Sequence, residues 1–299
     1  MRTYSTAINE TTVFLSMEKL TRVHFSNLNK VLYPELALRK ADIIQYYVKV
    51  APRILPFLKD RALVRTRYPN GIDGENFYEK DVPKGTPDWV QTFIKYSQSV
   101  DRDTEYVVCN DLDTLIWLAN LAALELHAPL SRITSINEPD LILFDIDPEP
   151  PAGLPDAVQT AFILKENLED HGLKPFVKSS GKKGIHVVFA LKPGKSFKDT
   201  SRFVHDVALS LRKQHDFITS ERSQTNEPDT VLLDYPQNSE RGTMVAPYSL
   251  RPLREATVST PLEWNELVSL RKYEYNIFNV PQIRNEPWKG LWDELFDLP

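Results

Sequence analysis

Short strand-like runs and helix-like segments alternate along this chain, without the steady strand–helix–strand rhythm of a doubly wound parallel sheet. Runs of apolar and β-branched residues predict strands at Ala62–Arg67, Leu141–Ile146, Pro175–Ser179, Ile185–Leu191 and Val231–Tyr235. Apolar residues at helical spacing predict helices over Ala41–Leu58, Thr114–Leu126, Ala157–His171 and Asp199–His215. This order favours an α+β fold in which mixed sheets are flanked by helices.

Proline and glycine positions refine these predictions. Pro52 and Pro56 predict a break or kink in the first helix, and Gly172 predicts the end of the third. Polar stretches predict loops at Gly71–Pro87 and Ser223–Thr230. The segment from Trp264 onward carries three tryptophans and is expected to pack as a helical cap. No linker-like stretch separates two cores, so residues 1–299 are expected to form a single domain.

The composition narrows the setting in which the protein works. Cys109 is the only cysteine, which excludes an internal disulfide and a cysteine-based zinc finger. No apolar run approaches the ~18 residues that a membrane span needs, and residues 1–10 lack the apolar stretch of a secretory signal. We therefore expect a cytoplasmic protein with no membrane partner.

Charge is distributed unevenly along the chain. The net charge of −5 argues by itself against nucleic-acid binding, but residues 1–67 carry 12 basic and 5 acidic side chains, and residues 172–213 carry 10 and 2. Two basic segments on an otherwise acidic chain suit a groove for a polyanion, because phosphate contacts are local. Solvated helix faces would give the same pattern, so charge leaves both readings open.

Two aspartates end a strongly apolar strand-like run. Asp145 and Asp147 are two residues apart, so a strand would project both carboxylates from one face. Their charges repel unless a cation lies between them, and oxygen ligands suit Mg²⁺ or Mn²⁺. Asp234 ends another apolar run and, beside the first two, would complete a two-ion site for phosphoryl transfer. The alternative is that all three are ordinary strand-exit and turn residues.

The segment Ser179–His186 lies between two strand-like runs and contains two glycines and two lysines. Glycines allow a tight turn whose backbone N–H groups can face a phosphate, and Ser180, Lys183 and His186 add further donors. Arg251 is another candidate phosphate ligand. A basic surface hairpin and, for the arginine, an ion pair at the rim are the alternatives.

Taken together, these motifs resemble the polymerase domain of bacterial and archaeal DNA ligase D, in the archaeo-eukaryotic primase superfamily. The similarity runs in order from about Phe25 to Leu267. The matching segments are 27–34, 67–74, 77–80, 117–120, 125–127, 144–148, 179–186, 233–238 and 245–251. The resemblance implies a primase-like fold with mixed β-sheets flanked by helices and the metal site in a central cleft.

The resemblance also implies roles for the matching residues. Two divalent ions, Mn²⁺ or Mg²⁺, would be bound by Asp145, Asp147 and Asp234. A ribo- or deoxyribonucleoside triphosphate would be bound by Ser180, Lys183, His186 and Arg251, with His127 and Gln237 near its sugar. DNA would be bound by Lys30, Lys19 or Arg22 at a 5′-phosphate, by Arg67, and by Phe77 and Tyr78 stacking on bases.

These roles divide the chain into a basic DNA-end-binding part (1–80), a catalytic core (105–260) and a C-terminal cap (261–299). The expected partners are DNA gaps, overhangs or breaks with a 5′-phosphate, a separate ATP-dependent DNA ligase and a Ku-like end-binding protein. Two departures from the family predict a weaker hold on DNA. Thr66 stands where relatives often carry Lys, and residues 224–229 are acidic where relatives are usually basic.

The expected activity is a metal-dependent nucleotidyltransferase that extends DNA 3′ ends or fills gaps during non-homologous end joining, with a preference for ribonucleotides. A primase that starts chains unaided would use the same residues. A two-metal phosphodiesterase would shorten 3′ ends instead. The alternative that is not an enzyme is a module that bridges DNA ends.

Overall fold

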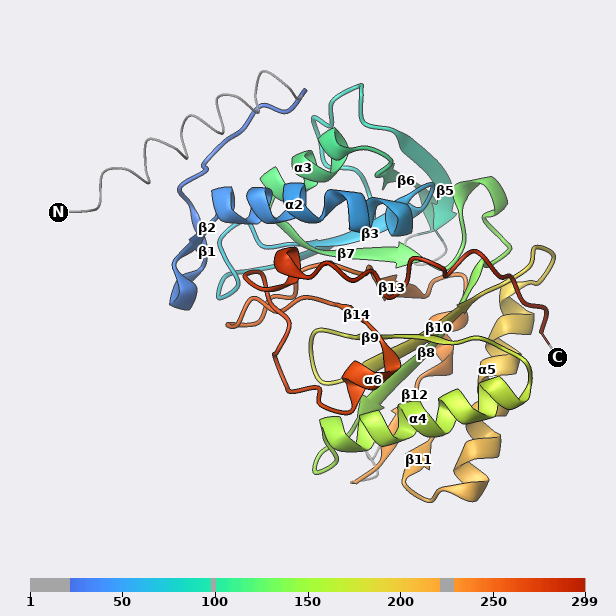
Figure 1. Ribbon diagram of the computed structural model, residues 1–299. Helices are drawn as coiled ribbons and strands as arrows, with labels where there is room; N and C mark the ends of the chain where they lie inside the picture. The colour runs from blue at the N-terminus through green and yellow to red at the C-terminus, as the bar shows by residue number, and fades with distance from the viewer. Residues whose placement is uncertain (1–21, 98–100, 221–228, 299) are drawn as a thin grey trace.

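Two β-sheets lie one above the other, with helices on their outer sides (Figure 1). The computed structural model describes residues 22–97, 101–220 and 229–298. We call the two sheets the upper sheet and the lower sheet, as drawn in Figure 1. The α+β class expected from the sequence is confirmed by this arrangement.

The upper sheet has the strand order β13-β7-β3-β6-β5, with β4 also paired to β3, and its pairs are antiparallel. Its strands are β3 (Ala62–Arg67), β4 (Phe77–Glu79), β5 (Thr92–Ser97), β6 (Arg102–Val108), β7 (Ala123–Pro129) and β13 (Thr243–Val245). Helices α2 (Lys40–Leu58) and α3 (Leu112–Asn120) pack on it. A separate two-stranded sheet joins β1 (Val31–Tyr33) to β2 (Leu38–Arg39).

The lower sheet has the order β11-β12-β8-β10-β9-β14. Its strands are β8 (Leu141–Pro148), β9 (Phe176–Ser179), β10 (Ile185–Ala190), β11 (Ile218–Thr219), β12 (Val231–Leu233) and β14 (Pro261–Leu262). Helices α4 (Leu154–Asp170) and α5 (Phe197–Gln214) cover its outer face. The remaining helices are short: α6 (Trp264–Leu267) and 3-10 turns at Pro34–Leu36, Ile133–Ser135, Tyr235–Asn238 and Val280–Gln282.

The alternation of side chains along β8 explains where its aspartates point. Ile142 and Phe144 are fully buried in the core that α4 and α5 form with the lower sheet. Leu143 belongs instead to the core shared with the upper sheet. Because successive side chains of a strand alternate between faces, Asp145 and Asp147 share the face of Leu143, toward the upper sheet.

Several local predictions are wrong. The helix predicted over 114–126 ends at Asn120, and strand β7 begins at Ala123 because Ala122 adopts a left-handed conformation (φ 58°) that turns the chain. The predicted loop 71–87 contains strand β4. The described part of the C-terminal cap, residues 261–298, is mostly irregular and contains only β14, the short α6 and one 3-10 turn.

Helix α2 runs without a break through Pro52 and Pro56. A proline inside a helix removes one backbone hydrogen bond, but α2 buries Ile43, Val50 and Ile54 completely. This packing compensates for the lost bonds, so the predicted break is absent.

Among the helices that the structure describes, none is both long and apolar enough to span a membrane.

Candidate functional site

Four polar side chains form a row across the lower sheet, on the face toward the upper sheet. In the antiparallel register, Asp145 of β8 lies opposite His186 of β10, and His186 lies opposite Lys178 of β9. Asp234 follows β12 directly, and its backbone N–H donates to the carbonyl of Asp145 at 2.9 Å. Directly opposite residues of antiparallel strands share a face. The sheet therefore brings Asp234 beside Asp145, which sequence alone did not establish.

The two aspartates of β8 have opposite pKa shifts. Burial raises the pKa of Asp145, but His186, Lys178 and Arg251 together outweigh it, so that pKa is lowered overall. His186 makes the largest contribution of the three, and its Nε2 lies 3.2 Å from Asp145 Oδ1. The pKa of Asp147 is raised to about 6 by burial and then by the charge of Asp145, with a smaller contribution from Asp234. The charges of Asp145 and Asp234 thus both repel that of Asp147.

This donor set fits divalent cations. Carboxylate oxygens are the ligands that Mg²⁺ and Mn²⁺ prefer, and the raised pKa of Asp147 indicates excess negative charge that a cation would relieve. Among the described residues, however, no three His, Cys, Asp or Glu side chains already form a group that could hold an ion. Asp145 contacts His186, and Asp234 Oδ2 accepts from Gln237 Nε2 at 3.3 Å. Ion binding would require these carboxylates to exchange partners.

The turn between β9 and β10 packs directly against this site. Ser180 Oγ accepts from the backbone N–H groups of Lys182 at 3.2 Å and Gly184 at 3.1 Å, so this hydroxyl shapes the turn. A side chain at Gly184 would lie 2.5 Å from the carbonyl oxygen of Ile146 and 2.8 Å from Asp147 Oδ1. The turn can approach the aspartates this closely only because position 184 has no side chain.

The two lysines of the turn point to different partners. Lys183 Nζ donates to the carbonyl of Pro148 at 2.9 Å and lies 3.3 Å from Glu149 Oε1, near the end of β8. Lys182 Nζ lies 3.4 Å from Glu125 Oε1 on β7 of the upper sheet. Sequence reasoning selected only Lys183, whereas the structure places a lysine on each side of the turn.

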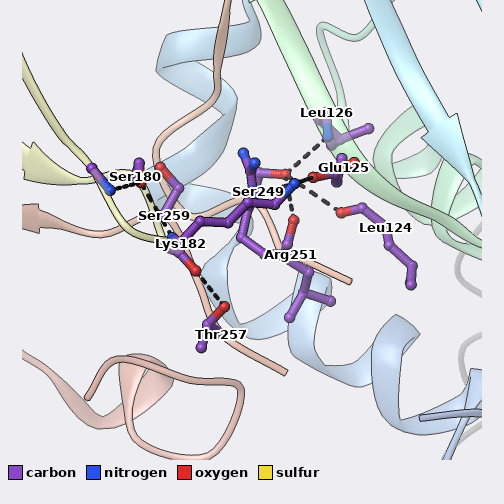
Figure 2. A network of polar contacts seen from close by, with 12 residues as sticks. Leu124, Glu125, Leu126, Ser180, Lys182, Ser249, Arg251, Thr257 and Ser259 are labelled. Atoms are coloured by element: carbon purple, nitrogen blue, oxygen red, sulfur yellow. Dashed lines mark hydrogen bonds and ion pairs between the residues drawn. The ribbon is translucent and has the colours of Figure 1, made fainter. Parts of the chain in front are cut away.

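Arg251 is buried between the two sheets, with 8% of its surface exposed. Its Nε lies 3.1 Å from Glu125 Oε1, and Figure 2 shows Glu125 between Arg251 and the backbone of β7. The alternative of an exposed rim ion pair is therefore wrong.

Lys178 is also fully buried, and its ammonium group contacts Ser259 Oγ. Burial lowers the pKa of Lys178 well below its ordinary value, and the charge of Arg251 lowers it further.

Gln237 contacts Asp234, whereas the neighbours described for His127 are Tyr78 and the charged Glu125, Arg251 and Lys182. His127 of β7 lies in the upper sheet, and burial lowers its pKa to about 4, so its ring is neutral at pH 7. Its ring centroid is 6.2 Å from that of Tyr78 on β4. Gln237 contacts Asp234 as described above. Burial, followed by the charge of Lys178, lowers the pKa of His186 to about 4 as well.

The predicted DNA-binding residues are more dispersed. Lys30 is exposed, and its Nζ donates to Asn70 Oδ1 at 2.8 Å. Arg22 is ion-paired with Asp113 at 2.7 Å and Asp111 at 3.1 Å. Arg22 is therefore already committed to these carboxylates, whereas Lys30 holds only a neutral partner among the contacts described.

Strand β4 limits two further predictions. Phe77 and Tyr78 are both substantially exposed, at 40% and 56%, but neighbouring strand residues point to opposite faces. A single base stack can therefore use only one of them. Arg67 lies opposite Phe77, and its guanidinium contacts Glu79 at 2.9 Å. Lys19 lies outside the described residues.

The two departures from the family pattern have different outcomes. Thr66 is buried and lies opposite Glu125 on one side and Tyr78 on the other. It therefore faces the site but offers no charge to a phosphate. Residues 224–228 of the acidic loop lie outside the described residues.

Besides Lys182, sequence reasoning assigned no role to three polar residues of this region. Lys178 stands alone in an apolar strand, and Glu125 stands alone in the apolar segment 121–128; an isolated charge in a buried strand was the available signal. Asn238 gave no such signal. Its side chain bonds both the N–H and the carbonyl of Leu143 and thereby fixes the turn after Asp234 to β8.

The comparisons with known proteins identify the class of this chain. Residues 39–292 match the family described as LigD, primase-polymerase domain, and the chain belongs to this family. A solved structure, the polymerase domain from Mycobacterium tuberculosis ligase D in complex with DNA, superposes with a TM-score of 0.86 at 30% identity. It covers 92% of this chain and 100% of that one.

Two relatives define the similarity further. The bifunctional non-homologous end joining protein LigD of Bacillus subtilis is 36% identical over 250 residues, which is 83% of this chain and 40% of that protein. The multifunctional non-homologous end joining protein LigD of Mycolicibacterium smegmatis is 31% identical over 254 residues, 84% of this chain and 33% of that protein. The chain thus spans 40% or less of either relative, and the resemblance inferred from its motifs is confirmed.

Proposed function

We propose that this chain is a metal-dependent nucleotidyltransferase. It adds nucleotides, preferentially ribonucleotides, to DNA 3′ ends at gaps and breaks that carry a 5′-phosphate, as a step of non-homologous end joining. One observation carries the proposal: Asp145, Asp147 and Asp234 lie on one face of the lower sheet beside a glycine-containing basic turn. The chain's membership of the LigD primase-polymerase family supports the same reading.

The three aspartates would hold two divalent ions, Mn²⁺ or Mg²⁺. When bound, such ions lower the pKa of an attacking hydroxyl and neutralise charge on a leaving pyrophosphate. Lys182, Lys183 and Arg251 supply positive charge for the triphosphate. Arg251 is mostly buried, and a fixed charge at low dielectric interacts strongly with a phosphate without reorganising.

The neutral histidines would act through hydrogen bonds and not through charge. A neutral imidazole offers one donor and one acceptor, which matches a hydroxyl that can both donate and accept. His127, with Gln237 nearby, would bind the ribose in this way, which supports the proposed ribonucleotide preference. His186 would orient Asp145.

The wider biological role follows as part of the proposal. Residues 1–80 would bind the DNA end, 105–260 would form the catalytic core and 261–299 would cap it. A separate ATP-dependent ligase would seal the product, and a Ku-like protein would bring the ends to the enzyme. The location would be cytoplasmic. The similarity to non-homologous end joining proteins and to a ligase D polymerase domain solved with DNA supports a role in end joining and DNA binding.

Changing Lys30 to Ala should weaken binding to a gap with a 5′-phosphate by about tenfold, because a charged contact to a phosphate is lost. The slope of log affinity against log salt concentration should become shallower by the amount that corresponds to about one lost phosphate contact. Fluorescence anisotropy with gapped duplexes measures both. Lys49→Ala, on the exposed side of α2, is the matched control. Equal binding of 5′-phosphorylated and 5′-hydroxyl gaps by the unaltered protein would refute this assignment.

The proposed activity is tested by primer extension on a gapped duplex with a 5′-phosphate and Mn²⁺, using ATP and dATP in parallel. We expect templated addition of either nucleotide, faster with ATP, and complete loss after chelation of the metal. Synthesis of dinucleotides without a primer would indicate a primase. Shortening of the 3′ end would indicate a phosphodiesterase. Tight binding without addition under any metal would indicate a bridging module.

A further inference from the structure

Glu125 lies at the meeting point of the two sheets, with 5% of its surface exposed. Its Oε1 is 3.1 Å from Arg251 Nε and 3.4 Å from Lys182 Nζ. Its Oε2 accepts from the hydroxyl of Tyr68 at 3.3 Å. Figure 2 shows these residues converging from separate segments: Glu125 from β7, Lys182 from the turn after β9, and Arg251 from the segment after β13. One carboxylate therefore compensates two cations that belong to different parts of the chain.

The contacts of Glu125 are charged but poorly hydrogen-bonded. Glu125 Oε1 and Arg251 Nε are both buried, and their 3.1 Å ion pair lacks the alignment of a hydrogen bond. The cations also repel one another: after burial, the charge of Arg251 is the largest influence lowering the pKa of both Lys182 and Lys178. A buried group of cations held by one misaligned carboxylate would be stabilised further by additional negative charge.

We propose that Glu125 is a positioning residue whose carboxylate stands in for the nucleotide's phosphates, holding Arg251 and Lys182 in place until a triphosphate takes Lys182 over. This inference rests on the proposed function, because it assigns the triphosphate to the same turn. Lys182 is the cation that transfers, since its side chain is 42% exposed and its ion pair is the longer of the two. Arg251 remains on Glu125, because it is almost completely enclosed.

The proposal predicts the direction in which substitution of Glu125 changes the affinity for triphosphate. Glu125 keeps its negative charge when the triphosphate arrives, so it competes with the phosphates for Lys182 and repels them. Glu125→Gln keeps the shape and removes the charge. The free variant should unfold at a lower temperature than the unaltered protein, and it should bind inorganic triphosphate about threefold to tenfold more tightly. A carboxylate with a purely structural role would give the first effect without the second.

The test measures the unfolding midpoint and, by calorimetry, the dissociation constant of inorganic triphosphate. Asp140→Asn is the matched control, because Asp140 pairs with the fully buried Arg61 at 2.7 Å away from the turn. It should lower the midpoint and leave the affinity for triphosphate unchanged. Unchanged or weaker binding by Glu125→Gln would overturn the inference. Failure of the unaltered protein to bind triphosphate or ATP would overturn the proposed nucleotide site and the inference with it.

Should Glu125→Gln not fold, Glu125→Asp can be measured instead. It retains the negative charge and therefore tests only the release of Lys182. Glu125 Oε1 makes both contacts, and the shorter side chain draws its carboxylate back toward β7. We expect the 3.4 Å contact with Lys182 to be lost before the 3.1 Å contact with Arg251, because it is the longer one. We expect about twofold tighter binding of triphosphate from the release of Lys182 alone. The Michaelis constant for ATP should fall in parallel, with little change in the maximal rate. A fall in the maximal rate at an unchanged Michaelis constant would contradict the stand-in role.

Discussion

Changing Asp145 to Asn is expected to slow nucleotide addition by about a thousandfold, because the site loses a charge on which both ions would depend. The fold should survive. Asparagine keeps an oxygen that can accept from His186 Nε2, which lies 3.2 Å away. The substitution also removes a charge that raises the pKa of Asp147. The lowered pKa of Asp145 means that its own charge stabilises the fold, so the two effects oppose each other and, without metal, the unfolding midpoint should change little.

Single-turnover extension measures the rate, and thermal unfolding measures the stability. Asp206→Asn, at a largely exposed position of α5, is the control for the loss of one carboxylate and should behave like the unaltered protein. Binding to gapped DNA should persist in both variants. A loss of rate accompanied by an equal loss of DNA binding and a lower unfolding midpoint would point to unfolding and contradict the assigned role.

Gly184→Ala is expected to raise the Michaelis constant for the nucleotide by more than about tenfold and to destabilise the fold by about 1–3 kcal/mol. The new Cβ would lie 2.5 Å from the carbonyl oxygen of Ile146 and 2.8 Å from Asp147 Oδ1. Rotation of the Asp147 side chain can relieve the second contact but not the first, because Ile146 presents its backbone carbonyl. The turn must move away from β8, carrying Lys182 and Lys183 with it.

Gly153→Ala is the matched control for this prediction. Its new Cβ would meet only Pro155 Cδ at 3.7 Å, an ordinary contact. Steady-state extension with increasing ATP, together with thermal unfolding, distinguishes the two glycines. Gly184→Ala with unaltered affinity for ATP would show that the turn does not position the nucleotide.

The sequence predicts much of the lower sheet because its strands have simple patterns. The run 141–144 is continuously apolar and predicts a buried strand, and the two-residue spacing of Asp145 and Asp147 then predicts that they share one face. The pairing of β12 with β8 involves a separation of more than 80 residues, and no local pattern encodes it. For this reason the sequence could suggest Asp234 as a third carboxylate of the site but could not show that it lies beside Asp145.

The failures of prediction have physical causes. Residues 115–126 are apolar except for Asn120 and Glu125, so a buried helix and a buried strand give nearly the same pattern. The left-handed Ala122 that separates α3 from β7 carries no glycine or proline signal. Glu125 was missed because it lies within this segment. Its function depends on Lys182 and Arg251, which only the tertiary fold brings to it.

The proposed nucleotidyltransferase activity depends on divalent ions held by Asp145, Asp147 and Asp234 at the end of β8. Titration of Mn²⁺ followed by electron paramagnetic resonance tests it most directly, on the unaltered protein and on Asp145→Asn, each with and without a non-hydrolysable triphosphate. We expect the unaltered protein to bind two Mn²⁺ ions when the triphosphate is present, and the variant to lose at least one. Equal Mn²⁺ binding by both proteins, or none by either, would contradict the claim.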